Sequence, residues 1–87
     1  MIKLHLVEAD LTIKQSRIIP VESTGISFDE LRGRIQKKLG APRLKFKYQD
    51  EDRDLITICD DSDLETAFAL QGSSEKPIKL LIWCFEL

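Results

Sequence analysis

The chain has 87 residues, of which 43% are hydrophobic and 32% are charged, and its formal net charge is −2. This length predicts one domain over residues 1–87 with one core, and the composition excludes a disordered chain. Two cysteines, Cys59 and Cys84, are too few for a disulfide framework or a zinc site, so we expect two half-buried, reduced thiols. The sequence shows no secretory signal, and its longest apolar run, Leu80 to Phe85, is too short to span a bilayer. We therefore expect a cytoplasmic protein that does not bind membranes.

The first part of the chain predicts a β-hairpin. Residues 2–7 alternate, with apolar side chains on one side and Lys3 and His5 on the other, as in a half-buried strand. A turn at residues 8–10 leads to a second extended run over residues 11–21.

A helix is predicted next. Ser27 and Glu30 form a capping box, and Ile26 before it completes a hydrophobic staple with Leu31. Apolar residues then recur at helical spacing until Gly40, which predicts the end of the helix.

The remaining elements complete a recognisable order. Residues 44–48 and 55–59 read as strands, and a second capping box of Ser62 and Glu65 predicts a short helix that ends at Gly72. A last strand is expected over residues 78–85. The order strand, strand, helix, strand, strand, helix, strand predicts an α+β domain in which a mixed sheet carries two helices, the ubiquitin-like β-grasp.

The charges are strongly segregated along the sequence. Eight of the fifteen carboxylates fall within residues 50–65, whereas residues 31–47 hold seven Lys or Arg residues and no acid. Like charges held this close repel one another, so the acidic segment needs a cation or a positively charged partner surface. A molecule whose positive and negative charges are separated in this way is better suited to electrostatic binding of a partner than to catalysis.

Enzymatic functions find little support in the residues. The only histidine is His5, which we place on the surface of an edge-like strand, and the chain has neither a Gly-rich phosphate loop nor a nucleophile elbow. We therefore expect a protein that is not an enzyme and that uses no cofactor.

Calcium and nucleic acid are two alternative ligands. Asp50, Asp52 and Asp54 occupy positions 1, 3 and 5 of an EF-hand pattern, with Asp61 at position 12. However, Leu55 stands where the calcium loop needs glycine, and the flanking segments read as strands, so we expect no metal site. The basic segment over residues 32–47 raises the possibility of nucleic acid, which the nearby acidic loop and a pI of about 5.3 oppose.

The acidic segment closely resembles a known signature. The sequence reads Tyr48-Gln49-Asp50-Glu51-Asp52-Arg53-Asp54-Leu55-Ile56-Thr57-Ile58, followed by Asp61-Ser62-Asp63-Leu64 and an apolar helix. This pattern is similar to the OPCA motif of Phox-and-Bem (PB-one) domains, and the resemblance covers the whole chain. In that family the acidic segment pairs front to back with a lysine of the first strand and basic residues of the second strand of a partner domain.

The resemblance implies roles for individual residues. Lys3 takes the position of the first-strand lysine, and its alternation with apolar neighbours places it on the open side of the sheet. Arg17 matches one residue of the basic pair in the second strand. The partner-binding acidic residues implied are Asp50, Glu51, Asp52, Asp54, Asp61 and Asp63.

Two departures from the family pattern stand out. Many members have glycine where this chain has Arg53, which implies either a different turn or a strained one, and which puts a cation inside the acidic loop. Arg17 also lacks the second basic residue of its pair, because Ser16 and Ile18 flank it.

The resemblance implies an interaction module that binds another Phox-and-Bem domain, either a different one or a second copy head to tail, in a signalling or scaffold protein. The alternative is a ubiquitin-like adaptor domain of a ubiquitin or autophagy pathway that does not pair in this way.

Overall fold

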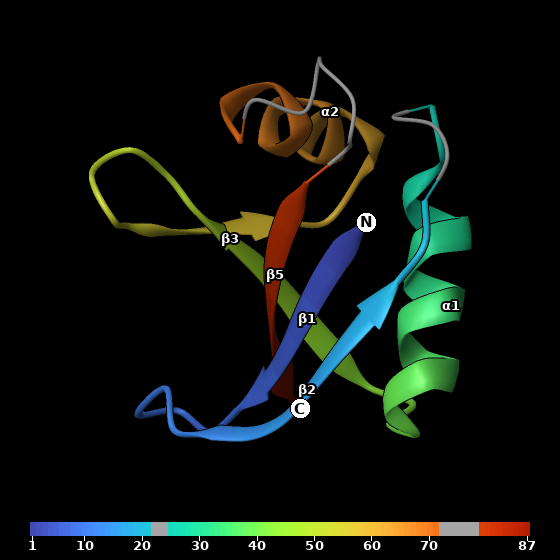
Figure 1. Cartoon of the computed structure of the whole chain (residues 1–87), viewed down its shortest axis with the longest axis vertical. Helices are drawn as coiled ribbons and strands as arrows, with labels where there is room; N and C mark the ends of the chain where they lie inside the picture. Colours follow the sequence, from blue (N-terminus) through green and yellow to red (C-terminus); the bar gives the residue numbers. More distant parts are fainter. Residues whose placement is uncertain (22–24, 72–78) are drawn as a thin grey trace.

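The computed structural model describes residues 1–21, 25–71 and 79–87 and contains the predicted order of elements. Their bounds are β1 (Ile2–Val7), β2 (Ile13–Ile19), α1 (Phe28–Leu39), β3 (Leu44–Gln49), β4 (Leu55–Ile58), α2 (Asp61–Leu70) and β5 (Leu80–Glu86) (Figure 1). The α+β class is thereby confirmed. Of the predicted bounds, Gly72 and Ile78 lie outside the described residues.

The five strands form one mixed sheet in the order β2-β1-β5-β3-β4. β1 and β5 are parallel, whereas β1 pairs with β2, β3 with β4, and β3 with β5 in antiparallel fashion. The strands at the two ends of the sequence therefore lie side by side in the middle of the sheet, and β2 and β4 form its edges.

Both helices pack on the same side of the sheet and enclose the core with it. Ile2 and Leu4 of β1 and Ile82 of β5 are at most 1% exposed and point to this side. They belong to one buried cluster with apolar side chains of both helices, which are Phe28, Leu31, Ile35 and Leu39 from α1 and Leu64, Ala67 and Phe68 from α2. The apolar side chains that alternate along the strands thus pack against the apolar stripes of the helices. The side of the sheet that points away from the helices is called the open face below.

His5, which points to the open face, is not the surface residue that the sequence predicts. β1 lies between β2 and β5, so it is not an edge strand, and His5 is only 9% exposed. Its Nδ1 is hydrogen-bonded to Ser16 Oγ at 2.8 Å, and its ring packs against Trp83 with the ring centroids 5.1 Å apart. Burial, together with the nearby charge of Lys3, lowers the pKa of His5 below its usual value. The prediction of a surface histidine was wrong because Trp83 covers it from a distant part of the sequence.

The ends of α1 largely follow the prediction. Ser27 Oγ accepts a hydrogen bond from Glu30 N at 3.1 Å, and Gly40 ends the helix in the left-handed conformation at φ 68°. The reciprocal hydrogen bond of a capping box, from Ser27 N to the Glu30 carboxylate, is not among the contacts of the described residues. The Glu30 carboxylate instead pairs with Arg34 at 3.3 Å.

The start of α2 differs from the prediction. Its N-cap is Asp60, whose carboxylate accepts a hydrogen bond from Asp63 N at 2.8 Å, so the helix starts before the expected Ser62 cap. Aspartate and serine are comparable N-cap residues, and the sequence offers both within three positions. The predicted pair of Ser62 and Glu65 is therefore not the capping box.

Three smaller observations complete the fold. The second strand is shorter than predicted, because Leu11 turns at φ 69° and β2 begins only at Ile13. Both thiols are free as expected, but neither is half-buried, since Cys59 is exposed and Cys84 is buried. Neither of the two described helices is long and apolar enough to cross a membrane.

Candidate protein-interaction site

The β3–β4 loop is organised around one of its own carboxylates. Asp50 Oδ1 accepts hydrogen bonds from the backbone N–H groups of Asp52 and Asp54, both at 2.9 Å. Backbone bonds from Asp50 N to Asp54 O and from Arg53 N to Asp50 O close the same loop. Aspartate favours such turns because its short carboxylate reaches backbone amides a few residues ahead. Asp50 therefore shapes the segment over residues 50–54, which is called the acidic loop from here on.

Arg53 adopts a backbone conformation that usually belongs to glycine. Its φ is 66°, in the left-handed region where a Cβ atom crowds the following carbonyl. Of the two outcomes that the sequence left open, the structure shows the strained turn. Gln49 Nε2 donates a hydrogen bond to Arg53 O at 3.2 Å and helps to hold this conformation.

The remaining carboxylates of the acidic loop point into solvent. Glu51, Asp52 and Asp54 are exposed, and no ion pair or hydrogen bond holds their carboxylates within residues 1–21, 25–71 and 79–87. Carboxylate oxygens of Asp50, Asp52 and Asp54 all lie within 4.8 Å of one another. Among the described residues no ion pair joins a lysine or arginine to these carboxylates, and Arg53 is the single cation of the loop, so the loop presents an excess of negative charge to the outside.

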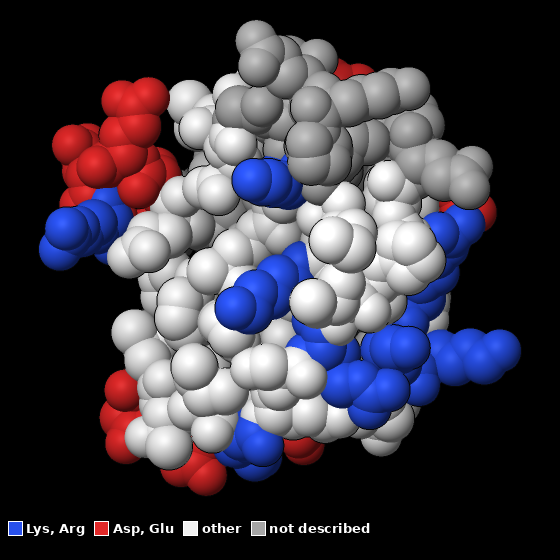
Figure 2. Space-filling view, in the orientation of Figure 1, with Lys and Arg blue, Asp and Glu red and all other residues white. Residues whose placement is uncertain are grey.

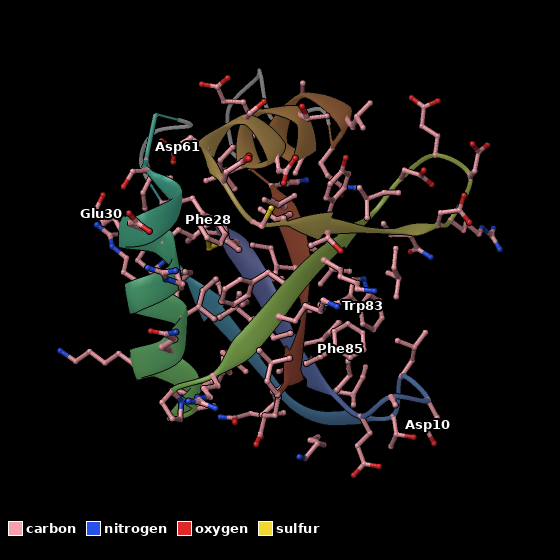
Figure 3. The ribbon with its side chains drawn as sticks, turned by 180° about the vertical axis from the view of Figure 1, so that it is seen from behind. Asp10, Phe28, Glu30, Asp61, Trp83 and Phe85 are labelled. Atoms are coloured by element: carbon pink, nitrogen blue, oxygen red, sulfur yellow. The ribbon has the colours of Figure 1, made fainter. Side chains whose placement is uncertain are left out.

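The second acidic group, Asp61 and Asp63, is engaged in local structure. Asp61 Oδ1 accepts a hydrogen bond of 2.6 Å from Phe28 N, a free amide at the start of α1 (both residues are labelled in Figure 3). Asp63 Oδ2 accepts hydrogen bonds from Cys59 N at 3.1 Å and from Cys59 Sγ at 3.2 Å. The bond to Asp63 raises the pKa of the Cys59 thiol. These carboxylates tie α2 to α1 and to Cys59 directly after β4, and each keeps a second oxygen outside these bonds.

The two predicted basic residues do not lie together. Lys3 pairs in register with Ile18 of β2 and Leu81 of β5, and it projects from the open face. Arg17 is opposite Leu4, whose side chain is in the core, so Arg17 projects to the side of the sheet that carries the helices. Successive residues of a strand point to opposite faces of the sheet. Lys3 is opposite Ile18, the neighbour of Arg17 in β2, so Lys3 and Arg17 point to opposite faces.

Arg17 instead joins cations of α1 that the sequence analysis did not assign to the site. Arg17, Arg34, Lys37 and Lys38 line a cleft of about 400 Å³ between β2 and α1, together with Ile19 and Pro20. These four cations are called the basic cleft. Figure 2 shows that Lys and Arg side chains gather over α1 and the adjoining end of β2, on the other side of the molecule from the acidic loop. Helical spacing in the sequence places the three α1 residues near one another, but their proximity to β2 requires the tertiary structure.

Strands flank the acidic loop on both sides, as the sequence predicts. β3 precedes the loop and β4 follows it, where an EF-hand would have helices. The site is therefore a charged turn at the edge of a sheet, framed on one side by α2.

Comparison with known proteins decides the family. The family model of the PB1 domain matches residues 1–87. The chain belongs to the PB1 domain family. A PB1 domain is a protein-interaction module and is not generally catalytic, so the acidic loop and the basic cleft lie on a domain whose role is to bind other proteins.

Solved PB1 structures share this fold at low sequence identity. One is the AtNBR1-PB1 filament (L-type), solved by electron cryo-microscopy, with 19% identity over 95% of this chain and 93% of that chain and a TM-score of 0.54. Another is the AtNBR1-PB1 domain, with 16% identity over 94% of each chain and the same TM-score of 0.54. These similarities support the PB1 fold of the chain.

Proposed function

We propose that this PB1 domain binds another PB1 domain front to back and self-associates head to tail, as part of a cytoplasmic signalling or scaffold assembly. The acidic loop of one molecule contacts a basic surface of the next. The observation that carries the proposal is the separation of charge in Figure 2, where the carboxylates of the acidic loop and the cations gathered over α1 lie on opposite sides of the molecule.

The proposed contact residues follow from this arrangement. Glu51, Asp52 and Asp54 supply the exposed carboxylates, while Asp50 holds the loop in shape. The second acidic group extends the surface along α2 through the oxygens that Asp61 and Asp63 keep free. The basic side draws on Lys3 and Arg17, which the family pattern assigns to it.

Physical considerations explain why such a contact would be extended and sensitive to salt. A single exposed ion pair contributes little, so affinity requires several pairs that are partly desolvated together. A contact between two different surfaces of the same molecule is heterologous and propagates into filaments unless the rotation closes a ring. AtNBR1-PB1 is a PB1 domain that forms a filament.

The test is the oligomeric state of the whole 87-residue chain as a function of protein and salt concentration. We expect oligomers of graded size at low salt that dissociate as the Debye length falls from about 10 Å at 0.1 M to about 3 Å at 1 M. Asp52→Ala with Asp54→Ala should give monomers that melt at the wild-type temperature. Glu8→Ala with Glu86→Ala removes the same charge far from the loop and should still assemble.

Two results would contradict the proposal in different ways. A wild-type chain that stays monomeric at high concentration and low salt would exclude self-association and leave a domain that binds only a different PB1 partner. Normal assembly of the Asp52→Ala, Asp54→Ala variant would show that the acidic loop is not the contact.

A further inference from the structure

We propose that the end of β4 remote from the acidic loop forms a second binding surface, which takes an extended segment of another protein. This segment places one apolar side chain in a pocket between α1 and the β3–β4 pair, and it places a carboxylate beside the cations at the rim. The pocket has a volume of about 240 Å³ and is called the edge pocket here. Its lining includes Phe28 and Arg32 of α1, Lys45 and Phe46 of β3, and Ile58 of β4.

The floor of the edge pocket is apolar. The rings of Phe28 and Phe46 meet edge to face with their centroids 5.8 Å apart, and Figure 3 shows Phe28 on the side of α1 that faces β3. Leu44 and Ile58, which also line the pocket, are buried. Pockets that enclose a drug-sized ligand measure about 300–1,000 Å³, so this smaller one suits a single side chain. An aliphatic or aromatic side chain gains most there, because it leaves water for an apolar surface.

The edge of β3 beside the pocket is uncovered. β4 pairs with β3 only from Phe46 to Gln49, so among the described residues no strand lies on that side of Leu44. The Arg43 carbonyl accepts a hydrogen bond from Leu87 N at 3.2 Å, on the side of β5. Backbone groups alternate in direction along an antiparallel strand, so those of Leu44 point away from β5. An extended segment can pair with them and continue the sheet, as peptides do at open sheet edges.

The rim of the pocket favours a ligand that carries a carboxylate. Arg32 and Lys45 line the pocket, and no acidic side chain does so in the described part of the chain. Asp29 pairs with Arg32 at 2.9 Å, whereas none of the ion pairs of the described residues involves Lys45. Asp63 lies beside Cys59 on the β4 side of the pocket. The complementary place for the carboxylate is therefore the β3 side, next to Lys45.

The edge pocket is separate from the surfaces of the proposed head-to-tail contact. The acidic loop precedes β4, whereas the pocket adjoins the last residues of that strand. Arg32 lies two positions before Arg34 of the basic cleft, and residues two apart on a helix do not share a side. Lys3 lies on β1, which β5 separates from β3. The proposal therefore does not depend on that contact, and a domain within such an assembly can hold a further protein.

The first experiment measures binding of a fluorescein-labelled octapeptide, with one leucine between two pairs of glutamates, to the whole chain at low salt. Fluorescence anisotropy should show saturable binding. Serine in place of the leucine should weaken it by at least about tenfold, since the apolar side chain is lost. Lys45→Glu should weaken it by at least about fivefold. Lys38→Glu makes the same change of charge in the basic cleft and should stay within about twofold of wild type.

The second experiment locates the peptide through a thiol. Cys59 lines the edge pocket and is exposed, whereas Cys84 is buried. Saturating leucine peptide should slow the reaction of Cys59 with iodoacetamide by at least about fivefold, and the serine peptide at the same concentration should not. Thermal unfolding checks that each variant is folded, and Lys45→Gln replaces the reversal if the reversed charge prevents folding.

Three results would overturn the proposal. They are the absence of saturable binding, equal binding of the leucine and serine peptides, and bound peptide that leaves Cys59 unprotected. Equal weakening by Lys38→Glu and Lys45→Glu would assign the peptide to general charge attraction and would also overturn it. The Asp52→Ala, Asp54→Ala variant should bind the peptide like wild type. Its oligomeric state tests the head-to-tail contact, so failure of one proposal is distinguishable from failure of the other.

Discussion

Replacing Asp61 by alanine should destabilise the fold by removing the link between the two helices. Asp61 Oδ1 accepts the 2.6 Å hydrogen bond from Phe28 N, and Asp61 also lies in the first turn of α2, where negative charge is favourable. Loss of a side-chain acceptor at a helix N-terminus costs about 1 kcal/mol, within a range of roughly 0.5–2 kcal/mol. Since Asp61 is exposed, water can partly replace its carboxylate, so we adopt about 1 kcal/mol from the middle of that range.

For an 87-residue domain, this loss corresponds to a decrease in melting temperature of about 4–8 °C. The assay is thermal unfolding followed by circular dichroism. Asp61→Asn keeps an oxygen acceptor for Phe28 N and should recover most of the loss. Asp54→Ala, which removes a carboxylate without a hydrogen-bond partner in the described chain, should stay within about 0.5 kcal/mol of wild type. If Asp61→Ala melted at the wild-type temperature, Asp61 would not link the helices.

Other residues give independent tests of the structure. Arg53→Gly should stabilise the protein by about 0.5–1 kcal/mol in urea unfolding, because glycine tolerates the left-handed turn, whereas Arg53→Ala keeps a Cβ atom and should give no such gain. The pKa of His5 in the folded state lies below its ordinary value of 6.5, so the unfolded chain takes up a proton more readily. Stability should therefore fall as the pH drops through and below about 6.5, and a His5→Gln variant should lose this part of the pH dependence. In thiol labelling of the folded protein, Cys59 should react while Cys84, whose pKa burial raises to about 12, should react only on unfolding; equal rates for both would contradict their different burial.

The order of elements could be predicted because each carries a local signal. The alternation of residues 2–7 and the helical spacing from Phe28 to Leu39 arise from periods of two and of about 3.6 residues, which the sequence displays directly. Ser27 and Gly40 mark the ends of α1 for local reasons as well. The acidic loop could also be predicted from a local signal, because its acidic residues lie close together in the sequence.

The side of the sheet to which Arg17 points could not be predicted, because it depends on strand register. The register of β1 against β2 shifts by one residue between Leu6 and Val7, and such a shift reverses the side to which the residues of a strand point, Arg17 included. No local signal fixes that register, so Lys3 and Arg17 were expected together although they lie on opposite sides. The burial of His5 escaped the sequence analysis for a similar reason, because its neighbour Trp83 belongs to the last strand.

The place of β5 in the sheet has a consequence for how the protein is made. β5 is the last strand in the sequence, yet it lies between β1 and β3 and is the strand that joins them. During synthesis the β1–β2 hairpin with α1 and the β3–β4 pair are made before that strand exists, and such non-local pairing slows folding. Until β5 is in place, the sheet does not yet hold the acidic loop away from the basic cleft of the same chain, so the opposite charges can attract each other within one molecule. Insertion of β5 fixes them at opposite edges, and we expect a newly made chain to gain its ability to assemble at that step.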